Sequence, residues 1–225
     1  TFDQVQQVLR EPCFGADARQ FDWLLAQMKK GATPERLESI ENPSMLSLDP
    51  PDHTRLRRLA THGFTFRYIQ SLEPRIQQIM DRCLARAGNA NVIDVVETIA
   101  KPLPAIVIAE MMGLPDSDHE QFQAWSEDLI GGTGINTAES AEKSQAASAA
   151  LINYFKQIVV SRQDEPASDD LIAQLIGARE SGDKLSAGEL YNTCLLLLVA
   201  GHETTTRLIG NGLYNLLIRP EQLPW

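Results

Sequence analysis

Cysteine is scarce in this chain, and the spacing of the few cysteines excludes two kinds of small protein. Cys13, Cys83 and Cys194 are odd in number and far apart, and no two of them have the C-x-x-C spacing. A disulfide framework and a cysteine-based zinc site are therefore both excluded. Such sparse cysteine is typical of a reducing compartment, and we predict a cytoplasmic protein.

Long apolar runs and an excess of basic charge are missing as well. The longest apolar run, Cys194–Gly201, is far shorter than the roughly 20 residues that cross a bilayer. Thr1–Arg10 has neither a basic leader nor an apolar stretch, so we expect no signal peptide and no membrane contact. The net charge of −10 argues against nucleic acid as a partner, because phosphate binding needs a basic surface.

One local group of basic residues departs from this acidic balance. It consists of Arg55, Arg57, Arg58 and Arg67. Such a group could dock an acidic partner or an anionic group of a cofactor. The alternative is an ordinary solvated helix face, and the sequence favours neither.

The periodicity of the apolar residues predicts a mainly α-helical fold. Strand-like alternation is confined to Asn91–Asp94. The stretches with helical periodicity are Ile69–Ala87, Leu103–Met112, Gln121–Ile130, Ala146–Val160, Leu171–Ala178 and Leu190–Ile218. Capping-box spacing occurs at Asp94–Glu97, Ser117–Glu120 and Ser186–Glu189. We predict a single helical domain over residues 1–225, with loops at Pro34–Pro51 and Gly131–Gly134.

The segment Asp49–Arg57 has the features of a helix start that could bind a carboxylate. Asp49 suits the N-cap and Pro50 suits the first helical position. His53 and Arg57 are four residues apart and therefore share a face beside apolar residues. An imidazole and a guanidinium there could clamp a carboxylate of an apolar ligand, whereas the alternative is that both face solvent.

The apolar helix predicted near the C-terminus contains residues that a purely structural helix would avoid. Gly201 and the β-branched Thr204–Thr206 lower helix propensity, and Glu203 adds a charge. Gly201 would let a flat or bulky group approach the backbone, and Glu203 and Thr204 pair a proton carrier with a hydroxyl. In the alternative interpretation, Thr204 merely bonds back to Ala200 and Glu203 pairs with a nearby arginine.

Two common catalytic motifs fail at this helix. His202-Glu203 begins like the zinc motif H-E-x-x-H, but Thr206 stands where the second histidine is needed. No serine lies in a Gly-x-Ser-x-Gly turn. We predict no metal ligand among the residues of this chain.

Together the two segments resemble the cytochrome P450 family, and closely its soluble bacterial members. Ala200–Thr205 (AGHETT) matches the family's (Ala/Gly)-Gly-x-(Asp/Glu)-Thr-(Thr/Ser) motif, and Asp49–Arg57 (DPPDHTRLR) matches the opening of its helix C. Pro102–Pro115 is similar to the helix-E region of the family, and Thr1–Arg10 to the entry of helix B. The resemblance spans the chain from the helix-B region to the start of helix J, in the family's order.

The resemblance implies a haem-thiolate monooxygenase that inserts oxygen from O₂ into a small apolar organic substrate. His53 and Arg57 would hold the haem propionates, and Ala200 and Gly201 would leave room for O₂ and substrate. Thr204 would hold a water and hydrogen-bond the bound oxygen, while Glu203 would supply protons. A ferredoxin- or flavodoxin-type donor would deliver electrons, and Arg55 and Arg58 would project outward to bind it.

The sequence departs from the family pattern where the haem iron is concerned. The family's Glu-x-x-Arg helix and its cysteine loop are absent, so we expect a P450 fold incomplete at both ends. Without the thiolate the iron lacks its axial ligand, and we expect this chain alone to be inactive. The alternative function is a non-catalytic helical fragment or a module that binds apolar ligands. Substrate-lining residues are expected in Gln20–Ser44, Gly131–Thr137 and Leu196–Thr204.

Overall fold

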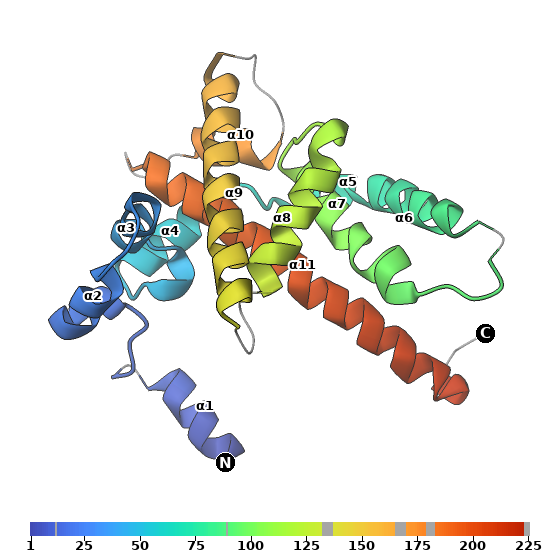
Figure 1. Ribbon diagram of the computed structural model, residues 1–225, viewed down its shortest axis with the longest axis horizontal. Coiled ribbons are helices and arrows are strands. Elements are labelled where there is room, and N and C mark those ends of the chain that lie inside the picture. The colour runs from blue at the N-terminus through green and yellow to red at the C-terminus, as the bar shows by residue number, and fades with distance from the viewer. Residues whose placement is uncertain (12, 89, 132–136, 165–169, 179–182, 223–225) are drawn as a thin grey trace.

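The computed structural model describes residues 1–11, 13–88, 90–131, 137–164, 170–178 and 183–222. Within these residues it contains helices and no strand (Figure 1). The α-helices are α1 (Phe2–Arg10), α2 (Asp22–Lys29), α3 (Pro34–Glu41), α4 (Asp52–Thr61), α5 (Phe66–Ser71), α6 (Glu73–Ala87), α7 (Pro102–Met111), α8 (His119–Gly131), α9 (Ala138–Asp164), α10 (Leu171–Gly177) and α11 (Ala187–Leu217). Shorter turns are η1 (Ala18–Gln20), η2 (Met45–Ser47), the π-helical η3 (Val96–Ala100), η4 (Asp116–Asp118) and η5 (Pro220–Gln222).

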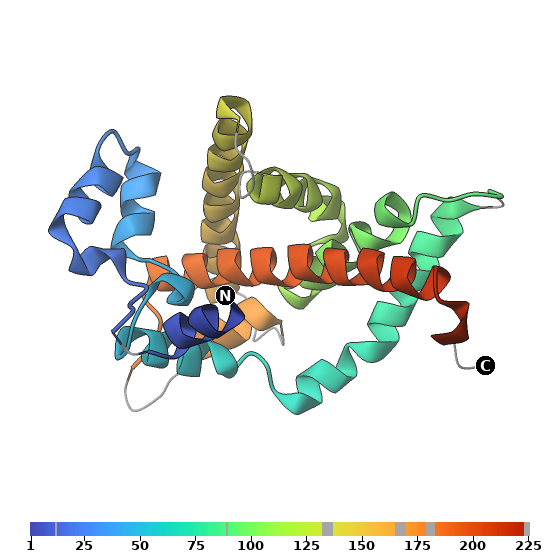
Figure 2. The same cartoon turned by 90° about the horizontal axis from the view of Figure 1, so that it is seen from below.

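The long helix α11 runs through the whole molecule and organises the core (Figure 2). Helices α7, α8 and α9 pack along its first two thirds, and α9 crosses it at a steep angle. Leu198 of α11 is fully buried together with Phe122 of α8 and Leu151 and Phe155 of α9. This cluster holds α11 in a fixed rotation, which decides which of its residues remain open to a ligand.

The predicted helical stretches are confirmed, but one local prediction is wrong. Asn91–Asp94, the one stretch with strand-like alternation, forms no strand and begins with a bend. Part of the predicted loop Pro34–Pro51 is helical, since α3 begins at Pro34 and ends at Glu41. Proline at the first helical position costs no hydrogen bond, and Ile40 of this helix is buried. Most of Gly131–Gly134 lies outside the described residues.

The capping predictions were correct for α11 only. Ser186 and Glu189 form the complete box, in which each side chain accepts the backbone N–H of the other residue. Asp94 accepts the N–H groups of Val96 and Glu97, without a reciprocal bond from Glu97. Ser117 donates to Asp118 instead of capping a helix.

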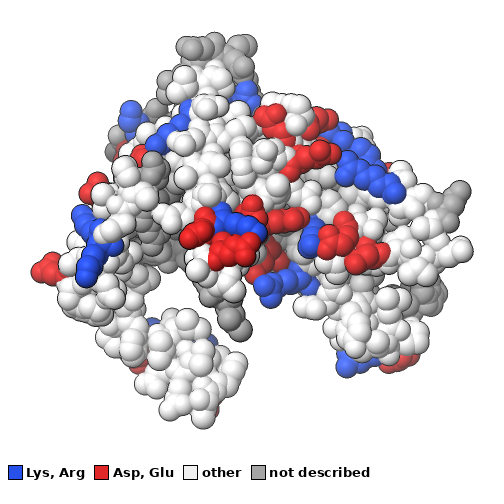
Figure 3. Space-filling view, in the orientation of Figure 1, with Lys and Arg blue, Asp and Glu red and all other residues white. Residues whose placement is uncertain are grey.

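Large apolar side chains remain exposed at several places, including α1 and the C-terminal part of α11. Phe2 and Leu9 of α1 are 74% and 80% exposed, and Leu208 and Leu217 of α11 are both 71% exposed. Figure 1 shows α1 standing away from the other helices, and Figure 3 shows few charged side chains on this part of the surface. Among the described helices, none is at once long enough and apolar enough to cross a bilayer.

Candidate functional site

The residues of the AGHETT motif lie on different faces of α11. Ala200 and Thr204 are exposed, as is Leu208 one turn further on, so these residues form an open stripe along the helix. His202 is buried on the other side, and Glu203 lies between the two faces with a quarter of its side chain accessible. The structure therefore offers Ala200 and Thr204 to a ligand and uses His202 for packing.

Thr204 and Glu203 already have partners on α11. The Thr204 hydroxyl donates to the carbonyl oxygen of Ala200 at 2.5 Å. A guanidinium nitrogen of Arg207 donates to Glu203 at 2.6 Å, and Arg207 itself is largely exposed. Both contacts expected from the alternative interpretation, in which these side chains bond only within their own helix, are thus present. Both lie at the surface, where water and a substrate can compete for them.

Gly201 permits close contact between two helices of the core. A Cβ atom at this position would lie 2.6 Å from Cδ1 and 3.0 Å from Cγ1 of Ile108 on α7. The missing side chain therefore makes room for α7. The sequence interpretation placed that room on the ligand side, but the structure places it on the packed side of α11.

His202 joins α11 to α8, a contact that the sequence did not indicate. Its Nδ1 and the hydroxyl oxygen of Ser126 are hydrogen-bonded at 2.5 Å, and both residues are buried. Burial lowers the pKa of His202, while the charge of Glu127 and the backbone of Lys101 oppose this shift. The imidazole is therefore held neutral one residue before Glu203. A histidine inside an apolar helix was the only sequence signal for this contact.

On α4 the predicted pair has the expected placement, although the helix starts later than predicted. Helix α4 begins at Asp52, with Pro51 as its N-cap, and the Asp49 side chain does not cap it. His53 is half-buried and Arg57 is exposed on the same face. Within the described chain, neither side chain has a polar partner, so both can donate to a carboxylate.

Arg55 does not project outward, which corrects the prediction made for it. Its guanidinium binds Glu189 at the start of α11 and lies 3.4 Å from Asp183. The hydrogen bond that Arg55 donates to the Glu189 carboxylate is the main cause of the raised pKa of Arg55. This ion pair fixes α4 to the first turn of α11. The predicted propionate-binding residues lie on α4, which contacts α11 at Glu189. Ala200 lies about 16 Å further along α11 at 1.5 Å per residue, so the two predicted groups of cofactor-binding residues are well separated.

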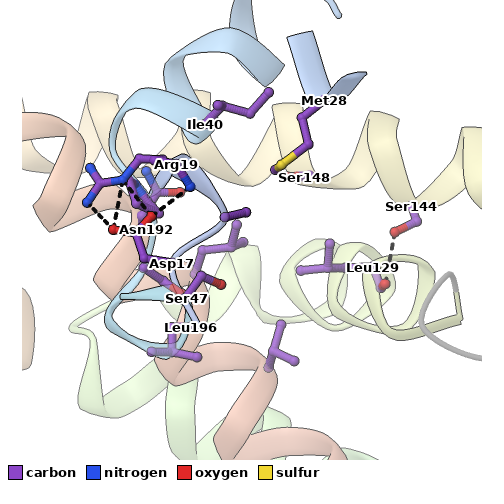
Figure 4. A pocket seen from close by; sticks show the side chains of 15 residues that line it. Asp17, Arg19, Met28, Ile40, Ser47, Leu129, Ser144, Ser148, Asn192 and Leu196 are labelled. Atoms are coloured by element: carbon purple, nitrogen blue, oxygen red, sulfur yellow. Dashed lines mark hydrogen bonds and ion pairs between the residues drawn. The ribbon is translucent and has the colours of Figure 1, made fainter. Parts of the chain in front are cut away.

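A pocket of about 360 Å³ lies beside the same stretch of α11 (Figure 4). Leu195, Leu196 and Val199 form its α11 wall. Leu196 and Ala200 are four residues apart and share a face, so Ala200 and Thr204 lie one and two turns beyond this wall on the same face of α11. Other lining residues are Asp17, Ala18, Arg19, Met28, Ile40, Pro43, Ser44, Ser47, Leu129, Ser144, Ser148 and Asn192.

The pocket combines an apolar lining with hydroxyl groups and a neutralised charge pair. Arg19 binds Asp17 at 2.7 Å, so neither contributes a free charge. Among the described residues, the hydroxyls of Ser44, Ser47 and Ser148 have no hydrogen-bond partner, which leaves them for a ligand. Gln20–Ser44 and Leu196–Thr204 both contribute to this lining, whereas most of Gly131–Thr137 falls outside the described residues.

Several lining residues were missed from the sequence. Ser144 and Ser148 share a face of α9, and Asn192 is a buried amide within an apolar run. The Asn192 amide donates to the carbonyl oxygens of Asn42 and Gly188. A polar residue inside an apolar run is a usable signal, but its partner 150 residues away is not readable from the sequence.

The residues present fit part of a haem site. His53 and Arg57 suit propionates, because they are donors without another partner in the described chain. An axial thiolate is not offered by the buried cysteines, since burial raises the pKa of Cys83 and raises that of Cys194 to about 12. Cys13 is exposed in the segment between α1 and η1.

A group of possible metal ligands lies elsewhere, between α6 and α8. Ligand atoms of Glu110, Asp116 and His119 lie within 4.8 Å of one another. Both Glu110 oxygens accept hydrogen bonds from arginines, at 2.5 and 2.8 Å from Arg75 and at 3.0 Å from Arg82. These bonds occupy the Glu110 carboxylate, so we interpret the group as a charge network.

Comparison with known proteins shows consistent similarity. A family model described as Cytochrome P450 matches residues 133–223. Cytochrome P450 107B1 of Saccharopolyspora erythraea is 39% identical over 228 residues, covering 99% of this chain and 53% of the relative. The chain thus spans about half the length of the curated relatives that it matches.

Solved structures are similar in fold as well as in sequence. A variant of the mixed-function P450 MycG in complex with mycinamicin IV has a TM-score of 0.72 and 39% identity, covering 79% of this chain and 44% of that chain. CYP109E1 from Bacillus megaterium in complex with testosterone has a TM-score of 0.73 and 34% identity, covering 80% and 48%. The all-helical arrangement therefore matches part of these structures.

Proposed function

We propose that this chain, which belongs to the cytochrome P450 family, forms the substrate- and oxygen-facing part of a haem-dependent monooxygenase. The observation that carries the proposal is the continuity between the pocket and the open stripe of α11. A ligand in the pocket lies beside Leu196 and Val199, and the next residues along that face are Ala200 and Thr204. A bound ligand would therefore lie on the same face of α11 as Ala200 and Thr204, one to two helical turns away.

In this proposal the chain positions the reactants and controls protons. Haem, when bound, supplies the oxygen chemistry. His53 and Arg57 bind its carboxylates, and Ala200 presents no bulky side chain on the open face of α11. Thr204 releases its bond to the Ala200 carbonyl to hold a water, and Glu203 exchanges protons between solvent and that water. The partial exposure of Glu203 suits this role.

The residues that line the pocket favour a particular chemical class of substrate. Its only described cation, Arg19, is paired with Asp17, so the part of a ligand that enters gains nothing from a charge. The apolar lining and the serine hydroxyls favour an apolar frame that carries hydroxyl or carbonyl groups. Testosterone, bound in one of the similar structures, has this chemistry.

We predict that Thr204→Ala uncouples the complete enzyme without emptying its haem site. The substitution removes the hydroxyl that holds water but leaves His53 and Arg57 in place. Haem content and substrate binding should stay within about twofold, whereas the fraction of reductant that yields product should fall several-fold in favour of peroxide. Product formed per reductant consumed measures this effect, and Thr205→Ala is the matched control. Unchanged coupling in the Thr204 variant would show that the hydroxyl is only structural.

A second candidate function is binding of apolar ligands without catalysis. The pocket supports it, as does the lack of an accessible thiolate among the described α-helices. A reduced, CO-treated difference spectrum distinguishes the two, because thiolate-ligated haem gives a strongly red-shifted band. Ligand binding by a haem-free protein, with no such band after haem is added, would favour the second function.

Electron delivery to the complete enzyme is expected from a separate acidic redoxin. Arg58 and Arg67 are exposed, and Arg58 lies on α4 with His53 and Arg57, whereas the Arg55 guanidinium is held against Glu189 at the start of α11. Electrostatic attraction would make the reduction rate fall as ionic strength rises. We expect Arg58→Glu to slow reduction at low salt by roughly tenfold and to flatten this salt dependence. Stopped-flow reduction at several salt concentrations measures both, and a rate insensitive to salt would rule out the steering role.

A further inference from the structure

The carboxylate of Asp49 binds a distant backbone segment instead of its own helix. The N–H of Ala16 donates to both Asp49 oxygens, at 2.9 and 3.1 Å, and the N–H of Asp17 donates to Oδ2 at 3.0 Å. The side-chain amide of Gln20 donates to the same oxygen at 3.2 Å. One carboxylate thus accepts hydrogen bonds from three of the six residues in the segment 15–20.

Gly15 completes this cradle because it has no side chain. A Cβ atom at Gly15 would lie 2.6 Å from Oδ2 of Asp49. The carboxylate therefore occupies the space that any other residue would fill. Two successive amides and the missing Cβ fix where the segment meets the residues before α4.

The segment that Asp49 holds is one wall of the pocket. Asp17, Ala18 and Arg19 all line it. The Asp17 carboxylate is locked onto Arg19, accepting from its backbone N–H at 2.9 Å and from its guanidinium at 2.7 Å. Arg19 also reaches Asp52 at 3.4 Å, so this wall is attached at its far end to the first turn of α4.

We infer that Asp49 is a positioning residue for the pocket. Its carboxylate holds the segment 15–20 against the start of α4 and so sets the place of the wall formed by Asp17–Arg19. Removing the carboxylate frees the wall to move and changes which ligands fit, while the helical core stays folded. The inference rests on the proposed function only for the nature of the ligand.

A change in ligand binding on removal of the Asp49 carboxylate could also come from a disturbed α4. The hydrogen bonds of Asp49 distinguish this explanation from an effect on the segment 15–20. The contact of Asp49 with α4 is made by its backbone carbonyl, which accepts the N–H of His53 at 3.0 Å. Every substituted residue keeps that carbonyl. Loss of the side chain should therefore act on the segment 15–20 and leave α4 intact.

Hydrogen exchange with single-residue resolution tests the inference on this chain without any ligand. Hydrogen bonds to charged groups are the stronger ones, so Asp49→Ala should speed exchange at the Ala16 and Asp17 amides by about 10- to 100-fold. Exchange at the α4 amides should not change. Asp22→Ala removes an exposed acid at the start of α2 and is the matched control.

Gly15→Ala gives a second route to the same disturbance. Its Cβ displaces the carboxylate, so the same two amides should exchange faster. In the Asp49→Ala background the added methyl meets no carboxylate and should have almost no further effect. Unchanged exchange at Ala16 and Asp17 in Asp49→Ala, faster exchange confined to α4, or additive effects in the double variant would each overturn the inference.

The consequence for binding is measured with testosterone and mycinamicin IV as probes in equilibrium dialysis. We expect Asp49→Ala to change the ratio of their affinities at least fivefold, and Asp22→Ala to preserve it. An unchanged ratio in Asp49→Ala, or an unchanged affinity where only one probe binds, would overturn the positioning role. If the wild-type chain binds neither probe, the proposed substrate class fails, whereas the exchange data still decide the role of Asp49.

Discussion

The protonation of His202 shows how burial changes the behaviour of a single residue in this chain. Burial lowers its pKa, so the folded state resists protonation more than the unfolded chain does. In the window between its folded pKa and the ordinary value near 6.5, the unfolded state binds more protons, and stability rises with pH. The contribution of a neutral His202 is complete above that value and is lost as the solution becomes acidic.

We therefore predict that the protein is less stable at pH 5.5 than at pH 7.5 and that His202 causes part of this loss. His202→Gln should lower stability at both pH values, because it disturbs the bond to Ser126, but should reduce the difference between them. Urea unfolding at pH 5.5 and pH 7.5 measures the stability of each protein and hence the difference between the two pH values. His62→Gln, at an exposed histidine, is the control, and an equal pH difference in all three proteins would contradict the prediction.

Contacts within one helical turn were easier to predict from the sequence than distant contacts. The alternative interpretation of Glu203 and Thr204 named a bond to Ala200 and a pairing with a nearby arginine, and both are present because Ala200 and Arg207 lie within one helical turn. It assigned the wrong partner to Asp49 and Arg55. Their contacts lie 33 and 134 residues away in the chain, where local periodicity carries no information.

At the scale of the helix, two of the four glycines in α11 have opposite environments. Gly201 faces Ile108 at a distance too short for a side chain, whereas a Cβ at Gly212 would meet no atom within 4 Å. Alanine in a helix is favoured over glycine by about 1 kcal/mol. At Gly212 this gain should appear in full, and at Gly201 overpacking should offset it.

We predict that Gly212→Ala raises the free energy of unfolding by about 0.5–1 kcal/mol. Gly201→Ala should instead lower it by about 1 kcal/mol or more, because overpacking typically costs 1–3 kcal/mol. Ile108→Val removes Cδ1, so in its background Gly201→Ala should become nearly neutral. Chemical unfolding of the four variants completes the cycle. Equal stabilisation by both alanines would show that α7 yields readily at this contact.

Element boundaries followed from the sequence wherever the apolar pattern was long. The stretch Leu190–Ile218 and the box at Ser186 predicted α11 within a few residues. Helix α3 was missed because the residues Pro34–Glu41 have few apolar positions, and Ile40 is buried only through tertiary packing. The start of α4 shifted because Asp49 is used by another part of the chain.

At the scale of the whole molecule, the surface left open by this chain should drive self-association. Figure 3 shows acidic and basic side chains interspersed over the centre of one face, with few of them over α1. Apolar side chains on α1 and the end of α11 are more than two thirds exposed, including Leu9, Leu208 and Leu217. Clustered exposed apolar groups gain about 25 cal/mol per Å² when covered, so contact between copies is favourable.

We predict that this chain, expressed alone, forms dimers or larger species at micromolar concentration, as sedimentation velocity would show. Replacing Leu208 and Leu217 together by glutamine should shift the distribution toward monomer, since both side chains are 71% exposed on the C-terminal part of α11. Val92→Gln alters a side chain that is 88% exposed in the bends before η3, and it serves as the control. If the open face of α11 drives association, only the leucine variant changes the distribution. A monodisperse wild-type monomer with a cooperative melt would mean that these side chains rearrange to cover one another, and the open stripe that carries Ala200 and Thr204 would then need a different explanation.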